Sequence, residues 1–463
     1  MKFDPTSKKL LWIGIIFYLI TTICSSNTPF FWDTILTSSV AQWFYNNGIQ
    51  RGIAPIIWDA GHPTFFQIYL TFAWKIFGKT LMISHLAMLP FLWLMTICFI
   101  YLLQKITLSL VSRVLGFILL LIHPYILTQS TLVSYDIVQI AFFLLAIIGI
   151  IDNRKLILVL GLWGLSSCSI RGQIVAILCL GSYCVIYFKN WKEFLPIILC
   201  SVIPIIAWHT YHYSNTGWMI STPSSTWESQ RSFANPQQII SNIIGITRGF
   251  IDYGMIGLSL LFFIALNQFR KIKWNNIEKQ LFSILFIVFV GMNGSMIFFS
   301  NPIGHRYFMI IHVLMILLIV SRIEQIKNFK VLTLIVFVAF ISGHFWLYPN
   351  GKSNGWDVTL KYTSYEKNRV QFWNYLIENN ISSQEIESAF PLFCSLKQTN
   401  LTLGERLLDI NEIPQKDSKY IAYSSVCNDM KSFANIDKNP KYLLIQKFGK
   451  GTTSISVYKK LEN

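Results

Sequence analysis

The sequence is poor in charged residues. Asp, Glu, Lys and Arg make up 13% of its 463 residues, whereas a soluble chain carries roughly 25%. Hydrophobic residues make up 53%. This composition excludes an ordinary soluble domain and predicts an α-helical polytopic membrane protein. The net charge of +16 is then interpreted as a signal of topology and of contact with membrane lipids, so we expect no nucleic-acid partner.

The cysteines show no metal-ligand spacing. Six of the eight lie in apolar runs and are interpreted as packing residues. Cys394 and Cys427 lie in the polar C-terminal region, where an extracytoplasmic location would allow one disulfide; an unpaired state is equally compatible with the sequence. The apolar run at 10–24 is followed by no small-residue cleavage site, which favours a retained first span over a cleaved signal peptide.

Eleven segments are predicted to cross a hydrocarbon core ~30 Å thick. They lie at about 10–27, 82–103, 112–129, 136–151, 155–171, 173–188, 194–212, 250–267, 281–299, 306–321 and 331–348. A further segment, 64–77, is only ~21 Å long as a helix. If it does not cross, sixteen basic residues fall on the cytoplasmic side and seven on the outer side before residue 349; if it crosses, this bias is inverted. We therefore predict that 64–77 is an interfacial helix on the outer face.

The same charge bias places the N-terminus in the cytoplasm, and an odd number of spans then places 349–463 outside the membrane. This tail carries 15 basic and 12 acidic residues in 115 positions. Its run SYEKNRVQFWNYLIENN has helical periodicity, and SAFPLFC, KYIAYSSV, KYLLIQKF and SISVYKK are typical of short strands. We predict a small α/β extracytoplasmic domain at 349–463, and a transmembrane domain at 1–348 with outer loops at 28–81, 130–136 and 213–249.

Acidic residues are scarce in the transmembrane part. Only ten precede residue 349, and five of these fall on the predicted outer side: Asp33, Asp59, Asp136, Glu228 and Asp252. Carboxylates close to hydrocarbon are costly, which makes these five candidates for a functional site. The alternative is that they cap helices or pair with the outer basic residues, and Asp33 stands where it would cap a helix.

The outer basic residues oppose the positive-inside tendency, so we expect an anion to compensate for them. The outer acids are one such anion and a lipid phosphate is another. Arg306, in NPIGHRYF, is the first candidate for phosphate, and snorkelling to the interface is the alternative. The other candidate substrate-binding residues are Tyr307, Arg171, Arg231, Arg248 and Lys75.

Three stretches resemble the integral-membrane GT-C glycosyltransferases, such as the protein O-mannosyltransferases and the aminoarabinose transferases of lipid A. They are WDTILTSSVAQWFYNNG, DAGHPTFFQIYLTFAWKIFGKT and HPYILTQSTLVSYD, within roughly residues 10–210. The family pattern is an acid after the first span, an H-P-P-like motif before an interfacial helix, and an acid in the second outer loop. These features fall on Asp33, on His62-Pro63 and on Asp136. Thr34 stands where many relatives have Glu, and Thr64 replaces the second proline.

The resemblance implies transfer of a sugar from a polyprenyl-phosphate-linked donor to a glycan, lipid or protein acceptor, on the outer face of a bacterial inner membrane. Asp33 would be the base of an inverting displacement and Asp136 a second carboxylate, with Asp59 and His62 at the mouth of the site. No cofactor is implied with certainty. A divalent metal is possible because His209 and His212, in WHTYHYSN, are three positions apart; a structural role for this pair is the alternative.

Other classes of membrane protein remain as alternatives. A lipid-linked glycan flippase or another transporter would more often show internal repeats and broken spans near the midplane. An outer-face glycan polymerase or ligase would depend more on a large outer loop with paired arginines. A structural scaffold is the last alternative. The position of the acids at loops and span ends favours an enzyme.

Overall fold

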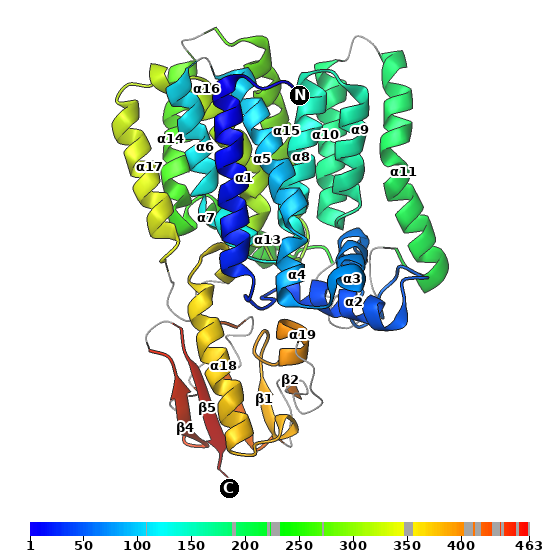
Figure 1. The fold of residues 1–463 in the computed structure, drawn as a ribbon, viewed down its shortest axis with the longest axis vertical. Coiled ribbons are helices and arrows are strands. Elements are labelled where there is room, and N and C mark those ends of the chain that lie inside the picture. Colours follow the sequence, from blue (N-terminus) through cyan, green and yellow to red (C-terminus); the bar gives the residue numbers. More distant parts are fainter. Residues whose placement is uncertain are drawn as a thin grey trace.

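The computed structural model describes residues 1–107, 109–187, 191–219, 223, 232–270, 273–346, 355–401, 411–412, 418–427, 436, 439–450 and 453–461. A bundle of apolar helices forms the larger part of the protein, and a small domain with a β-sheet lies at one end of it (Figure 1). The N-terminus lies at the opposite end of the bundle from this domain (Figure 1).

Each of the eleven predicted spans overlaps an apolar helix or a bent helix pair of the described chain. Four are long enough to cross a membrane alone: α1 (Pro5–Ser25), α4 with α5 (Leu81–Leu86 and Leu89–Ile106), α11 (Trp191–Thr216) and α15 (Asn276–Ile297). Two bent pairs bring this number to six: α6 (Leu110–Leu121) with α7 (Pro124–Ser130), and α13 (Pro236–Gly249) with η2 (Asp252–Gly254) and α14 (Met255–Phe269). Shorter apolar helices account for the rest: α8 (Tyr135–Ile151), α9 (Lys155–Ser166), α10 (Ile170–Ile186), α16 (Met309–Ser321, preceded by the 3-10 turn η3, His305–Phe308) and α17 (Phe329–Gly343). The prediction of a polytopic helical membrane protein is confirmed.

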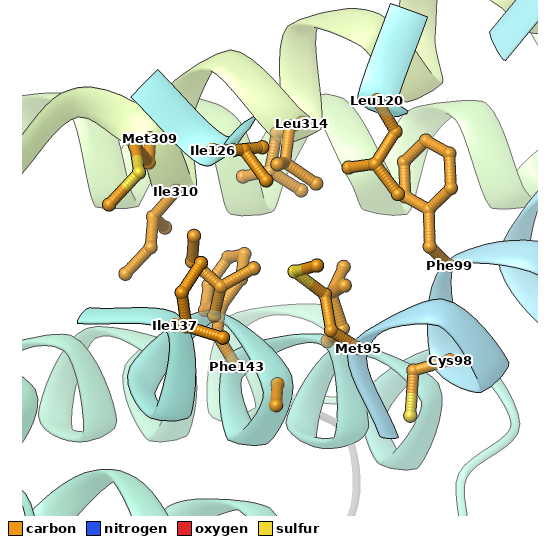
Figure 2. Packing of buried hydrophobic residues seen from close by; sticks show 14 of the residues in the cluster. Met95, Cys98, Phe99, Leu120, Ile126, Ile137, Phe143, Met309, Ile310 and Leu314 are labelled. Atoms are coloured by element: carbon orange, nitrogen blue, oxygen red, sulfur yellow. The ribbon is translucent and has the colours of Figure 1, made fainter. Parts of the chain in front are cut away.

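Helix α16 lies at the centre of the bundle. Every residue from Met309 to Val320 is buried, as expected for a helix that is apolar on all sides. Figure 2 shows Met309, Ile310 and Leu314 among side chains of α5, α6, α7 and α8. Because η3 leads directly into α16, packing of this helix fixes the position of Arg306 at its N-terminal end.

The two bent pairs have local causes. Helices α6 and α7 meet at 56°, and Pro124 begins α7 without a backbone N–H to continue the preceding helix. Helix α13 and the segment from Asp252 meet at 49°. Gly254 lies at this break with a φ of +84°, and a Cβ on it would lie 2.0 Å from the carbonyl oxygen of Ala339. The close approach of α17 therefore requires glycine at this position.

Two short helices follow α1 at the end of the bundle that faces the small domain (Figure 1). They are α2 (Thr34–Asn47) and α3 (Phe65–Phe77), joined by a hydrogen bond from Thr71 Oγ1 to the carbonyl oxygen of Ala41 at 3.0 Å. Helix α3 buries one face, which includes Trp74, and exposes Phe72 and Ile76. Its 13 residues extend ~20 Å, too short to cross. This geometry agrees with the interfacial helix predicted at 64–77.

The small domain contains η5 (Trp356–Val358), η6 (Ser383–Glu385) and two helices, α18 (Tyr362–Glu378) and α19 (Leu396–Asn400). Its five-stranded sheet has the order β2-β1-β3-β5-β4, with β1, β2 and β3 parallel and β3, β5 and β4 antiparallel. The strands are β1 (Ile386–Ser388), β2 (Asn411–Glu412), β3 (Tyr420–Ser424), β4 (Tyr442–Phe448) and β5 (Ile455–Lys460). The predicted α/β character is confirmed.

One strand prediction in this domain was wrong. The segment SAFPLFC was expected to form a strand, but β1 ends at Ser388, the first residue of that segment, and a turn follows. Pro391 explains the difference, because proline has no N–H to donate to a neighbouring strand. The other three predicted strands correspond to β3, β4 and β5.

The end of the bundle opposite the small domain has ion pairs of its own. Asp4 pairs with Arg113 at 2.6 Å and Glu278 pairs with Arg322 at 2.5 Å. All four residues belong to the set predicted to be cytoplasmic. The described acids that were predicted to be on the outer side, namely Asp33, Asp59, Asp136 and Asp252, lie at the opposite end.

Close packing of α8 against α9 depends on glycine. A Cβ on Gly161 would lie 2.5 Å from the backbone nitrogen of Ala146, whereas a Cβ on Gly181 in α10 would meet no atom within 4 Å. We expect Gly161→Ala to separate the two helices and to lower stability by about 1–3 kcal/mol. Gly181→Ala is the control and should leave stability unchanged or slightly increased. Thermal unfolding of both variants in detergent, followed by size-exclusion chromatography, checks this; equal midpoints would contradict it.

Candidate active site

Arg306 is the centre of a cluster of carboxylates at the end of the bundle that faces the small domain. Its side chain is only 4% exposed. Nη2 contacts Asp33 Oδ2, Nη1 contacts Asp357 Oδ2, and Nε lies 3.0 Å from Asp136 Oδ2. The four residues come from the first loop, the start of α8, the start of α16 and the segment that follows α17. The fold thus brings together charged groups that lie far apart in the sequence.

Asp33 precedes α2 but does not cap it. Its side chain makes no capping hydrogen bond to the helix. Instead, Thr34 Oγ1 accepts a hydrogen bond from the backbone N–H of Phe31 at 2.8 Å and donates one to the carbonyl oxygen of Phe31 at 2.7 Å. The capping role considered for Asp33 is therefore wrong for its side chain, and its carboxylate is left to contact Arg306.

Asp136 connects Arg306 to a second arginine. Arg171 Nη2 donates to Asp136 Oδ1 at 2.7 Å. The guanidinium carbon of Arg171 lies 3.7 Å from the ring centroid of Tyr307, and that of Arg306 lies 5.2 Å from it, so both cations stack on one aromatic ring. Ser134 fixes the start of α8, because its Oγ accepts from the backbone N–H of Asp136 at 3.2 Å.

The cluster has more acidic than basic groups. Three carboxylates and two guanidinium groups leave a formal charge of −1 when all five are ionised. Within the described residues, Arg171 Nη1 and Arg306 Nε are buried nitrogens without a hydrogen-bond acceptor of suitable geometry. A buried donor without an acceptor is costly, so these two nitrogens are available to an anionic ligand.

Asp357 is the member of the cluster that sequence reasoning missed. It lies in η5, just after the last span, and its backbone oxygen accepts from Gln129 Nε2 at 2.8 Å. Burial raises the pKa of the Asp357 carboxyl, and the nearby Arg306 acts in the opposite direction. Asp357 is the first acid of the predicted outer tail, nine residues after the end of the last predicted span at residue 348. That position was the available signal.

Asp59 and His62 lie in a neighbouring arrangement. Asp59 accepts from the backbone N–H of Gly61 at 2.8 Å and pairs with His212 Nε2 at 2.8 Å, so it bonds to α11 and not to Arg306. His62 Nδ1 accepts from the backbone N–H of Ile170 at 3.3 Å, one residue before Arg171. The structure therefore places His62 beside the helix that carries Arg171, whereas Asp59 contacts α11.

His209 and His212 have different partners. His209 Nε2 lies 2.9 Å from Gln173 Oε1, while His212 bonds to Asp59 and, through Nδ1, to the carbonyl oxygen of Trp218 at 3.0 Å. Across the described part of the chain, no group of three or more His, Cys, Asp or Glu side chains is arranged to hold a metal ion. The described residues thus give no support to a shared ion at this histidine pair.

The other candidate basic residues are not part of the Arg306 cluster. Arg248 Nε pairs with Asp252 Oδ2 at 2.9 Å, and His305 Nε2 lies 2.9 Å from the same oxygen. Lys75 is exposed near the end of α3. Arg231 and Glu228 lie outside the described residues. Of the predicted phosphate ligands, the structure brings together Arg306, Arg171 and Tyr307.

No family model matches the chain, and no curated protein matches it. Two solved structures are similar over almost the whole length. The crystal structure of ArnT from Cupriavidus metallidurans bound to undecaprenyl phosphate has a TM-score of 0.55 and 9% sequence identity, and the match covers 98% of both chains. The apo crystal structure of the same protein has a TM-score of 0.54 and 9% identity, covering 97% of this chain and 98% of that one. This likeness shows that the chain has the fold of these ArnT structures, in agreement with the fold class expected from the sequence.

Proposed function

We propose that the protein is a membrane glycosyltransferase that transfers a sugar from a polyprenyl-phosphate carrier to an acceptor at the outer face of the membrane. The observation that carries this proposal is the Arg306 cluster, which combines arginines suited to phosphate with a partly exposed carboxylate. The similarity in fold to an ArnT structure that holds undecaprenyl phosphate supports the same class of carrier. The acceptor is a glycan, a lipid or a protein.

The proposed reaction is a single displacement at the anomeric carbon. The acceptor oxygen forms a bond to this carbon as the bond from carbon to the phosphate oxygen breaks, and the electron pair stays on the phosphate. Asp33 receives the proton of the acceptor hydroxyl, because its side chain is 43% exposed while Asp136 and Asp357 are 7% and 5% exposed. Attack opposite the leaving group inverts the anomeric centre.

The arginines stabilise the charge that develops on the leaving phosphate. A sugar-linked polyprenyl phosphate is a diester with one negative charge, and its product is a monoester that carries nearly two. Arg306 and Arg171 present fixed N–H groups in a buried site, where such donors contribute more than they do in water. Asp136 bonds to both arginines and would hold their relative orientation.

The proposed location is a bacterial inner membrane. With the lysine-rich end in the cytoplasm, the N-terminus is cytoplasmic and the small domain is periplasmic. Residues 1–348 would form the transmembrane domain, and 349–463 the extracytoplasmic domain. The outer loops at 28–81 and 130–136 would then supply Asp33 and the residues around Asp136 to the site.

Replacing the proposed base should strongly reduce the rate of transfer. We expect Asp33→Asn to lower the rate of sugar transfer by about 10²–10⁴-fold, since the amide cannot take the proton of the acceptor. The assay uses purified protein in detergent, radiolabelled polyprenyl-phosphate sugars and an envelope acceptor fraction. Asp4→Asn, which breaks an ion pair at the other end of the bundle, is the matched control. Unchanged transfer by Asp33→Asn would move the base to Asp136 or Asp59.

The shape of the Arg306 side chain should matter as well as its charge. We expect Arg306→Lys to reduce transfer by about 10²-fold, because an ammonium group replaces a planar fork of donors with one point charge. Arg113→Lys is the control, since Arg113 also pairs with an aspartate but lies at the far end. Equal transfer rates for the two variants would show that Arg306 is not a phosphate ligand in the transition state.

A further inference from the structure

The three carboxylates around Arg306 are not equivalent. Asp136 and Asp357 are buried, and each has a further bond that holds its position: Arg171 donates to Asp136, and Gln129 donates to the backbone oxygen of Asp357. Asp33 is the exposed one of the three, and it makes no capping bond to its own helix. Arg306 is therefore held by two fixed partners and covered by one that is free to leave.

The segment that carries Asp357 is packed tightly into the end of the bundle. A Cβ on Gly355 would lie 2.7 Å from the ring atoms of both His305 and Tyr253. Thr359 Oγ1 donates to the carbonyl oxygen of His344 at 2.9 Å. Since the backbone on both sides of Asp357 is fixed in this way, its carboxylate holds Nη1 of Arg306 in a constant position.

We propose that Asp33 occupies the position of the carrier phosphate on Nη2 of Arg306, and that phosphate and Asp33 exchange there during each catalytic cycle. Asp357 is in this view a positioning residue, which keeps the guanidinium in place while its third partner changes. The inference rests on the proposed function, because it takes a polyprenyl-phosphate carrier as the ligand.

Charge balance favours such an exchange. When Asp33 moves away, the formal charge of the remaining cluster changes from −1 to zero. The cluster can then accept the monoanionic phosphodiester of the donor. The released carboxylate is then free to take the acceptor proton. Once protonated, Asp33 is neutral and does not compete with the phosphate monoester that forms. After it loses this proton to water, Asp33 competes again for Nη2 and favours release of the carrier.

The exchange predicts that removing the catalytic base tightens binding of the carrier. The experiment measures the Kd of the full-length protein for undecaprenyl phosphate in detergent micelles. We expect Asp33→Asn to lower the Kd about fivefold, the effect of removing a partly exposed competing ion pair. Asp33→Ser is a second variant that keeps the test valid if the asparagine variant fails to fold.

Asp357→Asn is the matched comparison, since it removes the same charge from the same arginine. It should bind undecaprenyl phosphate no more tightly than wild type, because it loosens Arg306 without freeing Nη2. Asp4→Asn should not change the Kd. If Asp357→Asn tightens binding as much as Asp33→Asn, the effect is long-range electrostatics and the exchange is overturned.

Two other outcomes separate this inference from the proposed function. If wild type binds the carrier and Asp33→Asn binds it equally or more weakly, the exchange is wrong while the proposed carrier stands. If wild type binds no undecaprenyl phosphate and transfers no sugar from any polyprenyl-phosphate donor, the proposed function fails and the exchange fails with it.

Discussion

A guanidinium group buried at the end of an apolar bundle needs counter-ions, and this constraint organises the outer end of the protein. Removing the partners of a buried charge costs about 3–5 kcal/mol, so the fold is stable only if carboxylates reach Arg306. They arrive from the first loop, from the start of α8 and from the segment after α17. One side chain thus links the transmembrane bundle, the surface helices and the small domain.

The small domain is part of this arrangement and contacts the first loop on both sides of Asp33. The backbone N–H of Phe30 donates to the carbonyl oxygen of Thr399 at 2.8 Å, and Ser38 Oγ donates to the carbonyl oxygen of Gln398 at 2.8 Å. The ring of Phe31 stacks on Tyr362 with centroids 5.1 Å apart. Through these contacts a domain outside the bundle fixes the loop that carries the proposed base.

Much of this arrangement could be predicted from the sequence, because charges are scarce in an apolar chain. Asp33, Asp136, Arg171 and Arg306 stood out as charged residues at span ends on one side of the membrane. Acidic residues are not scarce in the polar tail. Asp357 is one of 12 acids there, so scarcity alone does not single it out.

Tertiary geometry decided the remaining cases. Arg248 and Arg306 were both candidate phosphate ligands from the sequence. In the structure, Arg248 lies near the bend between α13 and the segment from Asp252, where it pairs with that aspartate. Likewise, Asp59 could be placed at the outer end of the bundle from the sequence. Its bond to His212 on α11 depends on helix packing, which spacing in the sequence does not report.

The most direct test of the central claim is a structure of the protein with undecaprenyl phosphate, determined by cryo-electron microscopy in a lipid nanodisc. Our account predicts phosphate density within hydrogen-bond distance of Arg306 and Arg171, with Asp33 turned away and Asp357 unmoved. Phosphate bound elsewhere, with the contact between Asp33 and Arg306 intact, would contradict the assignment of this cluster as the carrier site.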